Sequence, residues 1–429
     1  MAMRLLKANC LSCHNDEKQK GGLKLTSREA MMKGGDDGVV VVEGQPDESL
    51  LIRSLSADAD PHMPPKKQLS SAKIDLLKNW LRAGAPWDAA ALAGEPSAPR
   101  AVSLAPLPAG YKPILAMALS PDGSRLAVGC RNEVVLFDVS AKALTFRSRA
   151  TAHLDPVQSV AWTPDGKRLV TGAFRRVIVW NAEPLTQKRE IVAGLTDRIT
   201  AVRPLPDGTL AALADGQISE NGIVRILDIA SGQVVRSWPA HEDTIFSMAI
   251  SADGKLLATG GGDKLVKIWD IPAGKEIAKL EAHSTQVLGL AFNPDSTQLV
   301  TAGADRSLKV WDAKTRENTI ALAGKAASFN AVTWNAAGPA IFAVTDDGAL
   351  LRYKDLKTHT GAQSSDTGNE RELGRTDSAL YCVAVTDNGE RIFAGSSEGR
   401  ILGWDKDGKL LDNIDAAAAT TVATTAPAK

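Results

Sequence analysis

Residues His241–Asp270, HEDTIFSMAISADGKLLATGGGDKLVKIWD, carry the pattern that decides the fold of most of the chain. Apolar and other residues alternate through two short runs, and an Asp-Gly turn at Gly254 separates them, which is typical of a strand hairpin. A third apolar run ends in Trp269-Asp270. The turn recurs at intervals of 42 to 51 residues, at Gly123, Gly166, Gly208, Gly254, Ser296 in place of a glycine, Gly338 and Gly389.

A repeat of about 42 residues that contains four short strands is the signature of one propeller blade. Seven such units fit between residues 102 and 415. The pattern resembles the WD-repeat family, whose runs end in an aromatic or apolar residue that an acid usually follows. The resemblance implies an all-β seven-bladed WD-repeat propeller, a fold that is a binding platform without chemistry of its own.

The best-fitting units carry residues at the positions of the buried, hydrogen-bonded tetrad of that family. An indole N–H, a hydroxyl, an imidazole and a carboxylate can each satisfy the next inside the fold. Because these residues recur at equivalent positions, we interpret them as structural and not as catalytic. The complete tetrads are His241, Thr259, Asp263 and Trp269, followed by His283, Thr301, Asp305 and Trp311; the second unit has His153, Thr171 and Trp180 but Arg175 in place of the acid, and units three, six and seven lack the histidine.

A second motif lies near the start of the chain, where Cys10-Leu11-Ser12-Cys13-His14 reads CLSCH. Two thiols at this spacing followed by histidine form the signature of covalent c-type haem attachment, with the histidine as proximal iron ligand. A thioredoxin-like redox pair is the first alternative, but no βαβ pattern surrounds it. Half of a zinc site is the second, but no further Cys/His pair follows at the required spacing. Cys130 and Cys382 are expected to be small buried residues.

The residues around CLSCH predict a small all-α domain with long loops stiffened by glycine and proline. A short helix is expected from residue 1 to 14, a second from Pro46, and a third from Ser70 or Ser71 to Gly84. Fewer than 90 residues form a poor core alone, so a buried haem would supply the apolar centre. The loop PHMPP, residues 61–65, offers Met63 as a distal iron ligand, with His62 as its rival and Met31 and Met32 as weaker rivals.

Five blocks in order make this segment resemble the planctomycete-type cytochrome c domain over Cys10 to Asp88. The resemblance implies one covalent haem c on Cys10 and Cys13, His14 as proximal ligand and Met63 as distal ligand. The blocks are CLSCH, QKGGLKLTSREAMMKGG, VEGQPDESLLIRSL, HMPPKKQLS and LKNWLRAGAPWD.

The chain is therefore expected to be multidomain: a cytochrome c-like haem domain at residues 1–88, a linker at 89–101, the propeller at 102–415 and a disordered Ala/Thr-rich tail at 416–429. The last blade needs an outer strand, and Val102–Leu107 is the preferred candidate over Lys409–Ile414. Two polar insertions are expected to form recognition loops, one at Gly216–Gly222 and one at Lys357–Asp377.

Composition excludes several classes of function. Lysine plus arginine equals aspartate plus glutamate at 50 each, so no net charge favours nucleic acid, and no apolar run reaches the length of a transmembrane helix. Covalent haem implies a periplasmic or otherwise exported bacterial protein, although Met1–Asn9 shows no signal peptide. We expect electron transfer with the propeller docking a protein partner, which makes a carrier more plausible than an enzyme. The alternatives are a scaffold with a structural or sensory haem, and a peroxidase-like enzyme if Met63 leaves the iron open.

Overall fold

The computed structural model describes residues 2–65, 68–69, 71–87, 107, 110–218, 220–323, 327–336, 340–354 and 370–420. The chain forms two compact units, Met1–Ser103 and Leu104–Lys429. Each unit has its own hydrophobic core. Within the described residues, no helix is both long enough and apolar enough to span a membrane.

The described regular elements of the first unit are short helices joined by long loops. They are α1 (Ala2–Asn9), η1 (Lys20–Gly22), α2 (Arg28–Lys33), η2 (Pro46–Glu48), α3 (Leu50–Arg53) and α4 (Ser71–Arg82), where η marks a 3-10 helix.

Local chemistry explains where these helices begin and end. Ser27 caps α2, because its hydroxyl accepts a hydrogen bond from the backbone N–H of Ala30, and Gly34 ends the helix at a φ of 85°. The helix expected from Pro46 is interrupted, which corrects that prediction. The Ser49 hydroxyl bonds the backbone of Val42 and Gln45, so η2 and α3 are separate elements.

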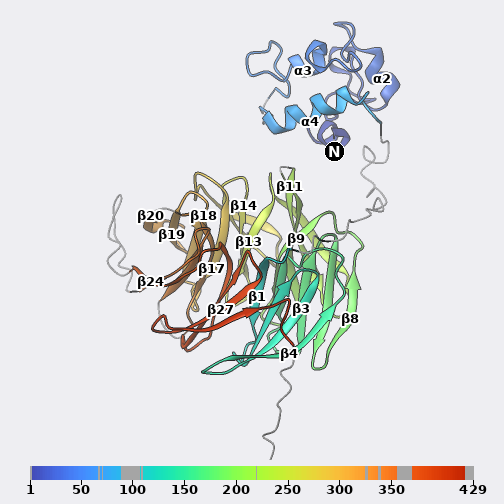
Figure 1. Cartoon of the computed structure of the whole chain (residues 1–429). Coiled ribbons are helices and arrows are strands. Elements are labelled where there is room, and N and C mark those ends of the chain that lie inside the picture. Colours follow the sequence, from blue (N-terminus) through green and yellow to red (C-terminus); the bar gives the residue numbers. More distant parts are fainter. Residues whose placement is uncertain are drawn as a thin grey trace, which may run out of the picture. The chain divides into compact units, whose positions relative to one another are not determined.

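The second unit is a seven-bladed β-propeller, which confirms the expected number of blades. Figure 1 shows the sheets side by side around a common centre, with the first blade next to the last. Each blade is a four-stranded antiparallel sheet of consecutive strands. The strands of blades one to four are β1 (Ile114–Leu119), β2 (Arg125–Cys130), β3 (Glu133–Val139), β4 (Leu144–Thr151), β5 (Ser159–Trp162), β6 (Arg168–Ala173), β7 (Arg176–Ala182), β8 (Leu185–Ile191), β9 (Arg198–Pro204), β10 (Leu210–Gln217), β11 (Asn221–Asp228), β12 (Val234–His241), β13 (Ile245–Ile250), β14 (Leu256–Gly261), β15 (Val266–Asp270) and β16 (Lys275–Leu280).

Blades five to seven have the same order, from the inner to the outer strand. Their strands are β17 (Val287–Phe292), β18 (Gln298–Gly303), β19 (Ser307–Asp312), β20 (Asn318–Ala323), β21 (Phe329–Trp334), β22 (Ile341–Thr345), β23 (Ala349–Tyr353), β24 (Glu370–Arg375), β25 (Leu380–Val385), β26 (Arg391–Ser396), β27 (Arg400–Asp405) and β28 (Leu410–Asp415).

The outer strand of the last blade is β28, so the preference for Val102–Leu107 is wrong and the Lys409–Ile414 alternative is close to the observed strand. Residues 102–106 lie outside the described residues. Within the described residues, no strand is exchanged between the sheets of the first and last blades, and side chains join the two blades. Arg391 donates hydrogen bonds to the Asp412 carboxylate within blade seven and to the carbonyl of Ser140 in blade one. Asp412 also accepts the backbone N–H of Leu144 at 2.8 Å.

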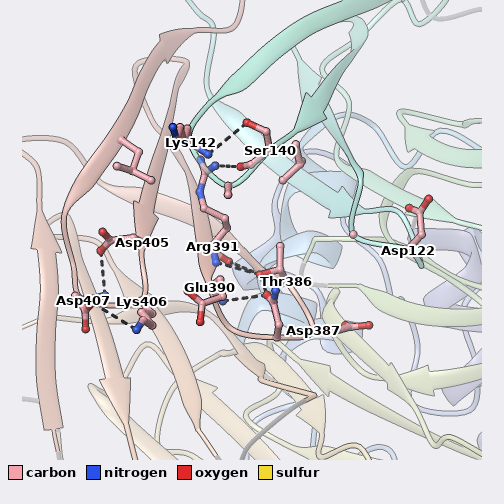
Figure 2. A pocket seen from close by; sticks show the side chains of 15 residues that line it. Asp122, Ser140, Lys142, Thr386, Asp387, Glu390, Arg391, Asp405, Lys406 and Asp407 are labelled. Atoms are coloured by element: carbon pink, nitrogen blue, oxygen red, sulfur yellow. Dashed lines mark hydrogen bonds and ion pairs between the residues drawn. The ribbon is translucent and has the colours of Figure 1, made fainter.

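We call Arg391, Asp412, Ser140 and Leu144 the closure clamp. The side chains of Arg391 and Asp412 are only 3% and 4% exposed. Figure 2 shows Arg391 reaching across to Ser140 beside a cavity of about 630 Å³, which the turns of blades one and seven line. At the other end of β28, Lys112 and Asp415 form a second, more exposed ion pair at 2.5 Å. The clamp places a buried charge pair at the point where the ring closes.

Two further expectations need correction. The predicted disorder from residue 416 does not hold for its first residues, because Ala416 is fully buried and Arg149 of β4 donates to the carbonyls of Ala416, Ala417 and Ala419. The predicted loop at Lys357–Asp377 ends in a strand, since Glu370–Arg375 is β24, and residues 355–369 lie outside the described residues. The insertion at Gly216–Gly222 lengthens the hairpin between β10 and β11, and Ile218 at its tip is 57% exposed.

Candidate functional site

The CLSCH residues continue the course of α1 as tight turns. The backbone N–H of Cys10 donates to the carbonyl of Leu6 at 2.8 Å, and the N–H groups of Cys13 and His14 both donate to the carbonyl of Cys10 at 3.1 Å. All four cysteines of the chain are free thiols, so Cys10 and Cys13 form no disulfide. The turn holds Cys10 and His14 next to each other at the end of the helix.

A cavity of about 600 Å³ opens beside this turn, within the size range of cofactor pockets. Cys10, His14 and Met63 all line it, although 49 residues separate His14 from Met63. Cys13 is not among the described lining residues. The remaining lining is mainly apolar, with a few charged groups: Lys20, Gly21, Leu23, Leu25, Gly35, Asp37, Val40, Leu50, Leu51, Arg53, Ser54, Leu55, Ala59, Asp60 and Pro61.

His14 is held by its backbone and leaves its ring without a partner on one side. Its carbonyl accepts the N–H of Leu25 at 3.0 Å. Its Nδ1 atom is buried and makes no hydrogen bond to any described residue. Burial lowers the pKa of the imidazole below its ordinary value and outweighs the backbone groups of Leu23 and Lys20 near the ring, which raise it, while the charge of Lys20 lowers it further. A neutral imidazole is the form that binds a metal ion.

The environment of Cys10 argues against a thioredoxin-like pair. Burial, together with the charge of Cys13, raises the pKa of the Cys10 thiol to about 11. A redox-active cysteine needs the opposite, a pKa lowered toward neutrality so that the thiolate forms. Among the described residues, no group of three or more His, Cys, Asp or Glu side chains is arranged to hold a metal ion.

Met63 is the methionine that reaches the cavity. Its backbone N–H donates to the carbonyl of Ser54 at 2.7 Å, which fixes the loop next to α3. Its rival His62 is absent from the described lining, and its Nε2 lies 2.7 Å from Oε1 of Gln68. Met31 is fully buried in the core and Met32 packs against that core, and neither lines the cavity.

These residues fit a haem. The cavity is of suitable size and mostly apolar, and it places an imidazole with an unsatisfied buried nitrogen, a thiol and a thioether sulfur on one surface. Histidine and methionine are the axial ligands of cytochromes c. The one departure is Cys13, whose sulfur accepts a 3.9 Å contact from the hydroxyl of Ser12 and does not line the cavity.

The structure also brings together both tetrads. In the first, His241 Nδ1 lies 2.8 Å from the Asp263 carboxylate and Nε2 lies 2.7 Å from the Thr259 hydroxyl, which also accepts the Trp269 indole N–H at 2.9 Å. The corresponding distances from His283 to Asp305 and Thr301, and from Trp311 to Thr301, are 3.0, 2.9 and 3.2 Å.

Each tetrad ties two blades together. His241 ends β12, the outer strand of blade three, whereas Thr259 and Trp269 belong to blade four. His283 follows the outer strand of blade four and bonds Thr301 in blade five. The sequence repeat therefore spans two blades, and the bonds across the boundary give these histidines and acids a structural role.

Blade two keeps a shorter version of this network. His153 Nε2 lies 2.7 Å from the Thr171 hydroxyl, which accepts the Trp180 indole N–H at 2.8 Å. With no acid at position 175, His153 Nδ1 is buried without a partner among the described residues, and Arg175 instead donates to the carbonyl of Thr196. Burial, aided by the charge of Arg176, lowers the pKa of His153 to about 3.

This pKa predicts a pH-dependent contribution of His153 to stability. Between pH 6.5 and about 3, the unfolded chain binds a proton on His153 and the native state does not, so stability falls as the pH falls through this window. We expect the advantage of the wild type over His153→Gln to shrink below pH 6.5, by at most about 1.4 kcal/mol per pH unit. Urea unfolding of both proteins from pH 8 to 4.5 measures it. A difference that stays constant across that range would contradict the prediction.

In place of the tetrad, blade three has a buried ion pair between Asp215 and Arg225, which was not predicted from the sequence. Asp215 in β10 is 1% exposed and accepts four hydrogen bonds, from the N–H and hydroxyl of Thr196, the N–H of Asp197 and Nε of Arg225 at 2.7 Å. The only indication in the sequence was the position of this acid within an otherwise apolar strand. Its partners, however, lie on other strands and loops.

The comparisons with known proteins agree with this architecture. The family model described as planctomycete cytochrome C matches residues 10–67, and the one described as WD domain, G-beta repeat matches residues 145–181, 232–270 and 274–312. No curated protein matches the chain. The chain thus combines a cytochrome c-like segment with a WD-repeat propeller. The cytochrome match ends at residue 67, so the block LKNWLRAGAPWD lies beyond it.

Proposed function

We propose that this chain is an exported c-type haem protein that transfers electrons, with the propeller acting as the docking platform for a protein partner. The observation that carries the proposal is the convergence of Cys10, His14 and Met63 on one largely apolar cavity. The cytochrome match over residues 10–67 includes all three of these residues.

In this proposal the chain's own residues hold and shield the cofactor. Cys10 and Cys13 supply the thiols for covalent attachment, His14 the proximal ligand and Met63 the distal ligand. A bound haem supplies an iron that cycles between the ferric and ferrous states by one electron. The apolar walls would exclude water, and a methionine ligand together with a histidine ligand would favour the reduced state. Rotation of the Cys13 side chain toward the cavity is required.

The role of the propeller rests on its fold and on the WD-repeat match. Its buried histidines bond threonine hydroxyls, its buried acids Asp215 and Asp412 pair with arginines, and repeat platforms of this type bind other proteins. A protein partner for the propeller is therefore part of the proposal. An exported location follows from the chemistry of covalent haem attachment.

Two other functions make different predictions. A peroxidase-like enzyme needs an open iron position, whereas Met63 lies on the same cavity as His14. A scaffold with a structural or sensory haem needs no rapid electron exchange. The tests are therefore whether the iron is open to added ligands and how fast it exchanges electrons.

The experiment uses the full chain, produced with an export signal and the haem-maturation machinery. We expect a reversible one-electron wave in voltammetry, rapid reduction by ascorbate, and no binding of carbon monoxide to the ferrous protein, since His14 and Met63 would both ligate the iron. Rapid carbon monoxide binding with peroxide turnover would favour the enzyme. Slow and irreversible reduction would favour the scaffold and contradict electron transfer.

A further inference from the structure

We propose that Arg53 binds a propionate carboxylate of the haem and thereby sets its reduction potential. The inference rests on the proposed function, since it requires a haem in the cavity. A c-type haem keeps two propionate carboxylates after its attachment through the thiols. These negative charges need cationic partners where an apolar cavity replaces water.

The described lining offers two cations, Lys20 and Arg53. In the described part of the chain neither side chain is paired with a carboxylate, whereas other cations of this unit are: Lys24 with Asp16, Arg28 with Glu43 and Lys78 with Asp47. The acids Asp37 and Asp60 also line the cavity. The two cations are thus the groups on this surface available to an incoming anion.

Position and chemistry distinguish Arg53 from Lys20. Lys20 belongs to the His14 wall, because its backbone N–H donates to the carbonyl of Cys13. Arg53 ends α3 on the Met63 wall, and the next residue, Ser54, accepts the backbone N–H of Met63. A guanidinium binds a carboxylate through two parallel hydrogen bonds and is more weakly hydrated than an ammonium. Arg53 lines the cavity and is also exposed to solvent, which places its side chain at the edge of the cavity.

The charge of Arg53 has a defined effect on the iron. A positive charge near the haem stabilises the ferrous form, which carries one charge fewer, so its removal lowers the potential. An arginine-paired propionate also stays ionised across neutral pH. Without that partner its pKa rises, and the potential becomes dependent on pH, because protonation of the carboxylate favours reduction.

The test is a redox titration of the haem-loaded full chain from pH 5 to 8, followed by its visible spectrum. For Arg53→Gln we expect a shift of about tenfold in the reduction equilibrium, which equals about 59 mV toward lower potential, and a new pH-dependent step. Arg53→Lys keeps the charge and should show a smaller shift. Lys20→Gln should lower the potential without a new step. Arg82→Gln, whose side chain bonds Asn79 outside the cavity lining, is the matched control.

A potential and pH profile of Arg53→Gln equal to those of Arg82→Gln would overturn the inference, as would a new pH step in Lys20→Gln alone. If Arg53→Gln takes up no haem, the loaded Arg53→Lys protein decides, and an unchanged potential and pH profile there overturns the inference. Absence of covalent haem in the wild type would instead overturn the proposed function.

Discussion

The Asp412→Ala variant is expected to lose about 3–5 kcal/mol of its free energy of unfolding, because the change leaves the buried Arg391 guanidinium without its counter-charge. It also removes the acceptor of the Leu144 backbone N–H. A loss of this size is a large fraction of the stability of an ordinary domain. Urea unfolding followed by tryptophan fluorescence measures it, since Trp404 lies in blade seven.

Asp415→Ala is the matched control for this prediction. It lies on the same strand and also binds across the closure, but its ion pair with Lys112 is about a quarter to a third exposed. Such a pair contributes roughly 0–1 kcal/mol. The double variant Arg391→Met with Asp412→Leu removes both charges and should recover much of the lost stability. Equal destabilisation by Asp412→Ala and Asp415→Ala would show that the clamp does not hold the ring closed.

The Met63→Ala variant of the haem-loaded protein is expected to convert the iron from low spin to high spin. The thioether of Met63 is the proposed distal ligand, and alanine offers no donor atom in its place. The reduction potential should fall at the same time, because methionine ligation favours the ferrous state. Visible absorption spectra of the ferric and ferrous proteins measure the change of spin state.

Met32→Ala is the control for this experiment, since Met32 packs against the core of the same unit without lining the cavity. It should keep the low-spin spectrum. A low-spin spectrum in Met63→Ala would show that a residue other than Met63 is the distal ligand. Visible spectra of His62→Ala would then test whether His62 is that ligand. The 2.7 Å contact between His62 and Gln68 leads us to expect no change there.

Short-range patterns predicted much of the architecture. The spacing of the turn glycines indicated seven blades, since each hairpin is a local structure whose turn favours a residue at positive φ. The described turn residues of this series all have a positive φ, and Gly338 lies outside the described residues. Even Ser296, which replaces glycine in unit five, has a φ of 58°. The tetrad positions were also predictable, because the repeat places them at fixed offsets from Trp269 and Trp311.

Contacts between distant segments were not predictable in the same way. Either of two short β-like stretches could complete the last blade, and the preferred one proved wrong because local composition does not say which stretch pairs with β27. The closure clamp joins Asp412 to Leu144, which lie 268 positions apart in the sequence, so no local pattern predicts this contact. The burial of Ala416 was not predictable either. This residue begins a segment of low sequence complexity, yet it is buried against blade one.

The candidate site was also predictable in its local motifs and not in the contacts between distant segments. CLSCH and the methionine in a proline-rich loop were recognisable from sequence, and the structure places Cys10, His14 and Met63 on one cavity. The sequence did not identify Arg53 as a site residue, because an arginine at the end of a short helix is an ordinary surface residue. Its significance depends on the cavity, which α3, the CLSCH turn and the Met63 loop form together.

The proposed function requires that this chain carries one haem covalently attached at CLSCH. The most direct measurement is the mass of the denatured full-length polypeptide after production with an export signal and haem-maturation machinery, beside Cys10→Ala/Cys13→Ala. We expect the mass of the chain plus one haem for the wild type and the mass of the bare chain for the double variant. A bare wild-type chain from cells that load a control cytochrome c would contradict it.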